Sequence, residues 1–177
     1  MIILASASKA RRKLIKICKR NAVLAKSDID ETRLQGESLF EYLERITYLK
    51  AVKFVSKKNT VISADTVIVF EDKIIGKPKS RQNAFEILKN LEGKKHFCFS
   101  GVTVLSNKRY EFFVDYAVVY MDRIGDKAIN DYLDKEDYKT KAAGYGIQGL
   151  ASKFMYVIKG DITTVIGLPM KKLCKII

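Results

Sequence analysis

The chain has 177 residues, and 47% of them are apolar, which is typical of a globular protein and too apolar for a disordered one. This length predicts a single domain over residues 1–177, or two small lobes that share one core. No run of about 20 apolar residues is present, so we predict no membrane span. The apolar segment 1–5 precedes the first basic residues, which is the reverse of a signal peptide, so we expect no secretory signal.

The cysteines and the net charge limit which cellular compartment and which partners can be expected. Cys18, Cys98 and Cys174 are odd in number and far apart, which predicts neither a disulfide framework nor a metal site, and we expect a cytoplasmic protein. The chain has 33 Lys and Arg residues and 20 Asp and Glu residues. The resulting net charge of +13 favours polyanionic partners. The basic residues before Asp28 can equally form a solvated helix face.

Apolar periodicity and turn residues predict the elements in chain order. The first half is expected to contain strand 2–5, a helix from Ser8 to about residue 20, strand 22–25, helix 38–57, and a hairpin of strands 61–70 and 73–75. The second half is expected to contain a helix from Ser80 to before Gly93, strands 96–105 and 110–121, helix 125–135, strands 154–158 and 163–166, and a helix that Pro169 opens. This order predicts an α/β fold with a mixed β-sheet and flanking helices.

Several kinds of chemistry are excluded by the residues present. His96 is the one histidine, so a zinc site with two or three histidines is impossible, and its apolar strand context favours a structural role. Neither a P-loop nor a dinucleotide-binding glycine fingerprint occurs in the sequence. A catalytic metal would therefore be a hard cation held by carboxylates, with Mg²⁺ or Mn²⁺ as the candidates.

Two segments carry the strongest chemical signals. Asp65 interrupts the apolar strand 61–70, and a buried carboxylate costs several kcal/mol unless it is paired or metal-bound, so Asp65 is a candidate general base or a structural ion-pair partner. Ser8 and Arg11 lie at a strand-to-helix junction, where free backbone N–H groups attract phosphate. An ordinary helix cap with an exposed arginine is the alternative there.

Three further residues are candidates for substrate contact. Lys77 lies in a Gly-Lys-Pro turn after the predicted hairpin, from which it could face Asp65 across a pocket. Lys50 follows an aromatic and apolar stretch of helix 38–57, where a lysine often only extends its stem over apolar surface. Gln148 stands between two glycines, and its amide could read the edge of a base.

Taken in order, these segments resemble the Maf family of nucleoside triphosphate pyrophosphatases over nearly the whole chain. The matching stretches are Leu-Ala-Ser-Ala-Ser before Arg11, Ser-Ala-Asp-Thr-Val around Asp65, Gly-Lys-Pro around Lys77, Gly-Ile-Gln-Gly around Gln148, and Val-Ile-Gly-Leu-Pro ending at Pro169. The resemblance implies two lobes around a cleft, often in a homodimer. It implies hydrolysis of dTTP, UTP or a modified nucleotide to the monophosphate and pyrophosphate, with a divalent metal.

The resemblance also implies a role for each matching residue. Asp65 would be the proton acceptor, and Glu31 and Asp65 would hold the metal. The triphosphate would be held by Ser8, Arg11, Lys50 and Lys77. Thr66 and Gln148 match the branch that prefers dTTP and UTP, whereas Ala10 replaces a family arginine at a position tied to substrate choice.

Two competing interpretations stay open at this point. A nucleic-acid-binding regulator that uses the basic N-terminal helix would explain the charge, but it leaves Asp65, Lys77 and Gln148 unexplained, and no groove-reading motif predicts a specific nucleic-acid partner. A role in cell division, which the name septum formation protein implies for the family, could accompany hydrolysis.

Overall fold

The computed structural model describes residues 1–18, 21–135 and 138–177. Its strands are β1 (Ile2–Ala5), β2 (Ala22–Ala25), β3 (Thr60–Phe70), β4 (Lys73–Ile75), β5 (Lys95–Ser106), β6 (Arg109–Met121) and β7 (Met155–Lys159). Its α-helices are α1 (Lys9–Ile15), α2 (Leu39–Val52), α3 (Arg81–Leu91), α4 (Gly125–Lys135), α5 (Ile162–Ile166) and α6 (Met170–Ile176). Short 3₁₀ turns are η1 (Lys16–Cys18), η2 (Ala142–Gly144) and η3 (Leu150–Lys153).

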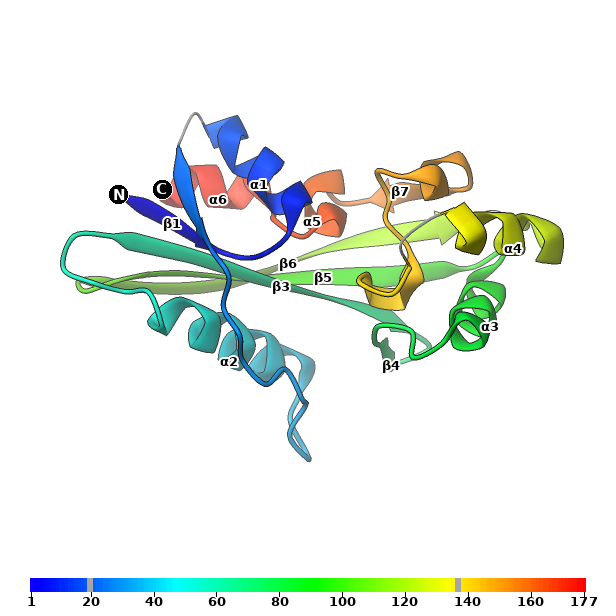
Figure 1. The fold of residues 1–177 in the computed structure, drawn as a ribbon, viewed down its shortest axis with the longest axis horizontal. Coiled ribbons are helices and arrows are strands. Elements are labelled where there is room, and N and C mark those ends of the chain that lie inside the picture. Colours follow the sequence, from blue (N-terminus) through cyan, green and yellow to red (C-terminus); the bar gives the residue numbers. More distant parts are fainter. Residues whose placement is uncertain (19–20, 136–137) are drawn as a thin grey trace. The chain divides into compact units, whose positions relative to one another are not determined.

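The seven strands form one mixed sheet, as the sequence predicts (Figure 1). The order is β2-β1-β3-β5-β6-β7, and the short strand β4 pairs with β3. Strand β1 is parallel to both β2 and β3, whereas β3 with β4 and β6 with β7 are antiparallel. The α/β fold class is therefore confirmed, and none of the helices in the described ranges is long and apolar enough to cross a bilayer.

The chain divides into two compact units. The first consists of Met1–Thr66, Ser100–Asp115 and Gly167–Ile177, and the second of Val67–Phe99 and Tyr116–Ile166. Within the first unit, α1 and α6 lie on one side of the strands and α2 lies on the other (Figure 1). The second unit has its own buried core, built by α3 and α4 against β5, β6 and β7.

Serine side chains start three of the helices, as their sequence positions predict. The hydroxyls of Ser8, Ser38 and Ser80 each accept a hydrogen bond from the backbone N–H three residues later. Glu41 returns a bond to the backbone N–H of Ser38, which completes a capping box at α2. Each cap satisfies a backbone donor that the first turn of a helix leaves without a partner.

Two predicted helix boundaries are wrong, and a third falls partly outside the described residues. The helix expected over 38–57 ends at Val52, because the Asn59 side chain binds the backbone of Phe54 and Ser56 and closes the chain into a loop. The helix from Ser8 ends at Ile15 and continues as η1 to Cys18; the predicted end near residue 20 falls outside the described residues. Pro169 caps α6 and precedes its first residue.

The strand predicted over 163–166 is the short helix α5. The β-branched residues of this segment favour a strand, but the Asp161 carboxylate accepts bonds from the backbone N–H and hydroxyl of Thr163, both at 2.7 Å. The backbone N–H of Thr164 also donates to the Asp161 carbonyl, at 3.0 Å. This local capping outweighs the strand preference of the side chains.

The prediction that the cysteines form no disulfide is also wrong. Cys18 in η1 and Cys174 in α6 are bonded, and 156 positions separate them in the sequence. Their pairing depends on the packing of η1 against α6, which no local spacing reveals. The cysteine pattern therefore gives no support to a reducing compartment. Cys98 is buried, and its Sγ lies 3.9 Å from the Thr164 carbonyl oxygen.

His96 has the structural position that its strand context predicts. Its ring is fully buried, and Nε2 lies 2.6 Å from the hydroxyl of Tyr145. The other ring nitrogen, Nδ1, has no hydrogen-bond partner among the described residues. Burial lowers the pKa of His96 from 6.5 to about 4, so the ring is neutral near pH 7.

Candidate active site

Strand β3 places Asp65 beside helix α2. The strand is almost wholly apolar, and its alternation turns the side chains of neighbouring residues to opposite faces of the sheet. The Asp65 side chain is 14% exposed, and its Oδ1 lies 2.8 Å from Nζ of Lys50 on α2. The carboxylate predicted in this strand is therefore largely withdrawn from solvent and paired with a lysine.

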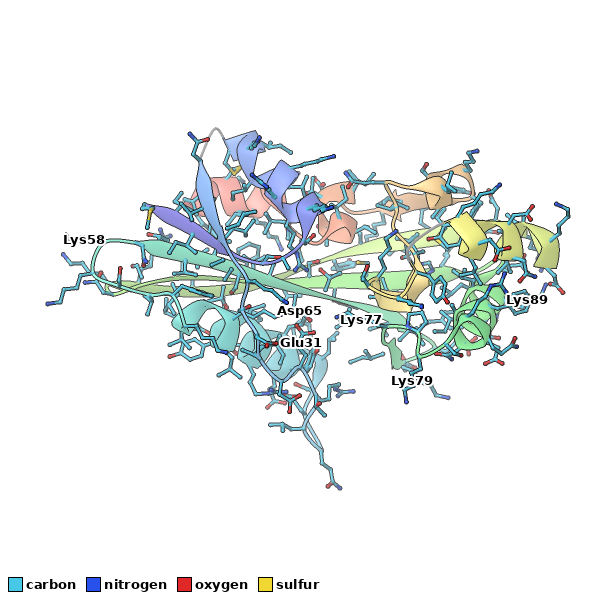
Figure 2. All side chains as sticks on the ribbon, in the orientation of Figure 1. Glu31, Lys58, Asp65, Lys77, Lys79 and Lys89 are labelled. Atoms are coloured by element: carbon cyan, nitrogen blue, oxygen red, sulfur yellow. A yellow bond between two sulfur atoms is a disulfide. The ribbon has the colours of Figure 1, made fainter. Side chains whose placement is uncertain are left out.

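Lys50 joins Asp65 to a second carboxylate. Its Nζ also lies 2.7 Å from Oε1 of Glu31, and the Lys50 side chain is only 8% exposed. The Glu31 side chain is 39% exposed, so the cluster opens to solvent on that side. Figure 2 shows Glu31 and Asp65 together on the α2 side of β3. One buried ammonium thus bridges two carboxylates, which leaves the trio with one net negative charge.

Glu31 lies in a loop without regular structure, and side chains of α2 hold that loop in place. The hydroxyl of Tyr42 donates to the Glu31 carbonyl oxygen at 3.2 Å, and Nη2 of Arg45 donates to the Thr32 carbonyl oxygen at 3.0 Å. Lys53 donates to the carbonyl oxygen of Asp28. Tyr42 and Arg45 lie on the same helix as Lys50, and Lys53 is the C-cap of that helix. Helix α2 and its cap therefore position both the Lys50 ammonium and the backbone of the loop that carries Glu31.

An ion pair closes the other end of the same loop. Nε and Nη2 of Arg45 donate to the two carboxylate oxygens of Glu37 at 2.5 and 2.8 Å, in a bidentate arrangement. These hydrogen bonds lower the pKa of Glu37 from 4.5 to about 2. Burial raises the pKa of Tyr42, and the charges of Asp65 and Glu31 raise it further. Both groups therefore keep their ordinary charge near neutral pH.

Arg11 makes its contacts within the first unit, on the face of β3 opposite Asp65. Its Nε donates to the Gly167 carbonyl oxygen at 2.7 Å, its Nη2 to Thr66 Oγ1 at 3.0 Å, and its Nη1 to Ser6 Oγ at 3.4 Å. Three segments far apart in the sequence thus meet at one guanidinium. Arg11 therefore stabilises the junction between β1 and α1, for which the sequence predicts phosphate binding.

Thr66 and Gly167 complete that arrangement. Thr66 Oγ1 lies 2.8 Å from the hydroxyl oxygen of the fully buried Ser100. A Cβ atom at Gly167 would lie 2.9 Å from Thr66 Oγ1 and 3.0 Å from Nε of Arg11, and the φ of Gly167 is +104°. Only glycine allows this close approach without a shift of its neighbours.

The predicted site residues of the first unit therefore fall into three places. The structure brings Glu31, Lys50 and Asp65 together against α2, whereas Arg11 and Thr66 meet on the opposite face of β3. Ser8 caps α1, and Ala10 lies in the first turn of that helix.

Lys77 and Gln148 belong to the second unit. Lys77 follows β4 in a turn whose Gly76 carbonyl oxygen accepts a bond from the backbone N–H of Ala143 at 3.0 Å. Gln148 lies in a turn that the backbone N–H of Gly149 closes onto the Gly146 carbonyl oxygen, also at 3.0 Å.

The carboxylates of Glu31 and Asp65 fit a hard divalent cation. Their oxygens converge on one nitrogen, so both can reach a single cation, and Mg²⁺ is commonly held by one or two carboxylates together with substrate phosphates. Across the described ranges, no three His, Cys, Asp or Glu side chains gather into a metal-binding group. A cation here would therefore complete its coordination with water or with substrate oxygens.

Sequence reasoning missed the residues that position this cluster. No role was predicted from the sequence for Tyr42, Arg45 or Glu37. The available signal was that Glu31, a candidate metal ligand, lies in a segment for which no helix or strand was predicted and which therefore needs partners to hold it. Ser100, whose hydroxyl meets Thr66, also received no predicted role.

Comparisons with known proteins agree with the arrangement of motifs along the chain. The sequence profile of the family described as Maf-like protein matches residues 1–177. A protein of Clostridium botulinum strain Eklund 17B, named dTTP/UTP pyrophosphatase, is 36% identical over 180 positions, covering 97% of this chain and 95% of that protein. A protein of Desulforamulus reducens with the same name is 37% identical, covering 97% and 92%.

One solved structure also shows a partial likeness. The Ham1 protein of Staphylococcus aureus superposes with a TM-score of 0.47 at 18% sequence identity, covering 71% of this chain and 72% of that one.

Proposed function

Since this chain belongs to the Maf-like protein family, we propose that it hydrolyses nucleoside triphosphates to the monophosphate and pyrophosphate, with dTTP and UTP as its substrates. The observation that carries the proposal is the withdrawn carboxylate of Asp65, held by Lys50 beside Glu31. Relatives of similar length carry the same pyrophosphatase name. A regulator without hydrolytic activity is not favoured by any of these relatives.

Asp65 acts in this proposal as the proton acceptor. A water molecule attacks the α-phosphorus, the bond from that phosphorus to the bridging oxygen of pyrophosphate breaks, and the proton of the water passes to the Asp65 carboxylate. In the substrate-free protein, Lys50 holds that carboxylate through the 2.8 Å contact with Oδ1. Because a carboxylate has two oxygens, one can keep a cationic partner while the other accepts the proton.

Charge neutralisation supplies most of the remaining catalysis. A nucleoside triphosphate carries close to four negative charges, so its hydrolysis depends on positioning and on nearby cations. A divalent cation, Mg²⁺ or Mn²⁺, would neutralise part of that charge when held by Glu31 and Asp65. Lys50 and Lys77 would add point charges to the triphosphate.

Ser8 and Arg11 are the remaining phosphate-binding candidates. The N-terminal backbone of α1 and the Arg11 guanidinium both offer donors that suit phosphate oxygens. Arg11 already donates to Gly167, Thr66 and Ser6, so a phosphate would have to share these donors. We therefore place Arg11 as a phosphate contact that also holds Thr66.

The base preference rests on Thr66 and Gln148. Their hydroxyl and amide match the branch of the family that acts on dTTP and UTP. Ala10 removes the family arginine from a position tied to substrate choice, so we expect a weaker distinction among bases than in relatives that keep it.

A pyrophosphate-release screen tests the proposed function. The full chain is incubated with dTTP, UTP, dCTP, dATP and 7-methyl-GTP, with Mg²⁺, Mn²⁺ or Co²⁺ in turn. We expect dTTP and UTP to be the best substrates, with equal yields of nucleoside monophosphate and pyrophosphate. Release of single phosphates, or no turnover with any pair, would contradict the proposal.

A further inference from the structure

The space between Glu31 and Asp65 is already filled by a cation of the protein itself. One nitrogen, Nζ of Lys50, lies 2.7 Å from a Glu31 oxygen and 2.8 Å from an Asp65 oxygen. These are the two carboxylates that fit a divalent cation. An ammonium and a metal ion cannot share one position, so only one of them can lie between these oxygens at a time.

We propose that Lys50 occupies the divalent-cation position in the substrate-free protein and must turn away before a metal ion binds there. This inference rests on the proposed function, because it takes Glu31 and Asp65 as the metal ligands. It assigns Lys50 a second role, as an internal competitor of the metal, besides contact with the triphosphate.

The surroundings of Lys50 allow such an exchange. The Glu31 loop is held to α2 through backbone carbonyl oxygens, by Tyr42 and by Arg45, and these bonds do not involve Lys50. Asp65 is held by strand β3. A lysine has a flexible four-carbon stem, so its ammonium can move while the helix stays in place. The two carboxylates therefore remain in position when Lys50 leaves.

The phosphates of the substrate offer the Lys50 ammonium alternative ion-pair partners. A buried ammonium leaves its carboxylates only if other anions replace them, and substrate phosphates provide such anions. A triphosphate that draws Lys50 away uncovers the carboxylates for the metal, and a bound metal releases Lys50 to the phosphates. By linkage, each ligand then strengthens the binding of the other by the same factor.

The test measures Mn²⁺ binding to the substrate-free protein, by calorimetry and by the paramagnetic signal of free Mn²⁺. Lys50→Met removes the ammonium but keeps an apolar stem of similar length. We expect this variant to bind Mn²⁺ tighter than the wild type by about tenfold or more, because a competing unit charge within a few ångströms has been removed. Lys50→Gln, a second uncharged variant, should show the same direction.

Lys58→Met is the matched control. Lys58 is exposed in the loop between α2 and β3, and Figure 2 shows it far along β3 from Asp65, so the variant loses one positive charge away from both carboxylates. Its Mn²⁺ affinity should equal that of the wild type within about twofold. The double variant Lys50→Met with Asp65→Asn should lose the gain. Thermal unfolding with and without EDTA establishes that each variant is folded.

A second experiment measures the coupling between nucleotide binding and Mn²⁺ binding. An α,β-imido analogue of dTTP, which cannot release pyrophosphate, should tighten Mn²⁺ binding to the wild type but change it much less in Lys50→Met. Equal Mn²⁺ affinity of wild type and both Lys50 variants would overturn the inference, as would weaker binding by the variants. Neither arm involves turnover, so absence of pyrophosphate release in the substrate screen would contradict the proposed function separately.

Discussion

Replacement of His96 by Gln should remove a pH dependence of stability that the buried ring creates. Burial lowers the pKa of His96 to about 4 in the folded protein, whereas the ring has an ordinary pKa of 6.5 when the chain unfolds. The unfolded state therefore binds a proton first as the pH falls. The stability that the neutral ring contributes is fully present above pH 6.5 and is lost between 6.5 and 4.

The size of the loss follows from the two pKa values. Each unit of difference is worth about 1.4 kcal/mol, so the free energy of unfolding should fall by about 2 kcal/mol near pH 5 and about 3 kcal/mol near pH 4 from this group alone. The ring is fully buried, and within the part of the chain that the structure describes its Nδ1 has no hydrogen-bond partner, so solvent does not relieve the cost of charging it.

Urea unfolding of wild type and His96→Gln, repeated at several pH values, measures the effect. Glutamine does not titrate, and its amide can replace the contact with the Tyr145 hydroxyl, so the difference between the two profiles isolates the imidazole. The wild type should lose about 3 kcal/mol relative to the variant between about pH 7 and about pH 4. Parallel profiles would refute the assignment of a buried neutral ring.

Three further predictions concern the first unit. Arg45→Met should loosen the loop before α2 and lower pyrophosphate release by about tenfold or more, with a small change in unfolding midpoint; unchanged release would contradict the role of this loop. Gly167→Ala should reduce the free energy of unfolding in urea by at least about 1 kcal/mol, because the new Cβ meets Arg11; a stabilised variant would argue against the contact. Cys174→Ser should lower the free energy of unfolding, measured by thermal unfolding, by roughly 2–5 kcal/mol. A reductant should lower the stability of the wild type by the same amount and leave that of the variant unchanged. A wild type whose stability does not respond to the reductant would contradict the bond between Cys18 and Cys174.

The fold could be predicted wherever a local rule decides the structure. The apolar run of β3, its hairpin with β4 and the serine caps of α1 and α3 were all visible in short segments. Where two local preferences compete, the prediction was wrong: the β-branched residues of α5 favour a strand, but the Asp161 side chain stabilises a helical turn.

The site could be predicted in its parts but not in its pairing. Asp65 and Lys50 were each candidates, but 15 positions separate them, and their contact depends on the packing of α2 against β3. Arg11 donates to Thr66, 55 positions away, and to Gly167, 156 positions away, and the disulfide also joins residues 156 positions apart. Such contacts are set by tertiary packing, which leaves no trace in local spacing.

The central claim is that the Asp65 carboxylate accepts the proton of the attacking water. Its most direct test is pyrophosphate release from dTTP by Asp65→Asn, measured beside binding of the α,β-imido analogue. The account predicts a fall in turnover of roughly 10²–10⁴-fold while the analogue still binds. Wild-type release of pyrophosphate by the variant would contradict it.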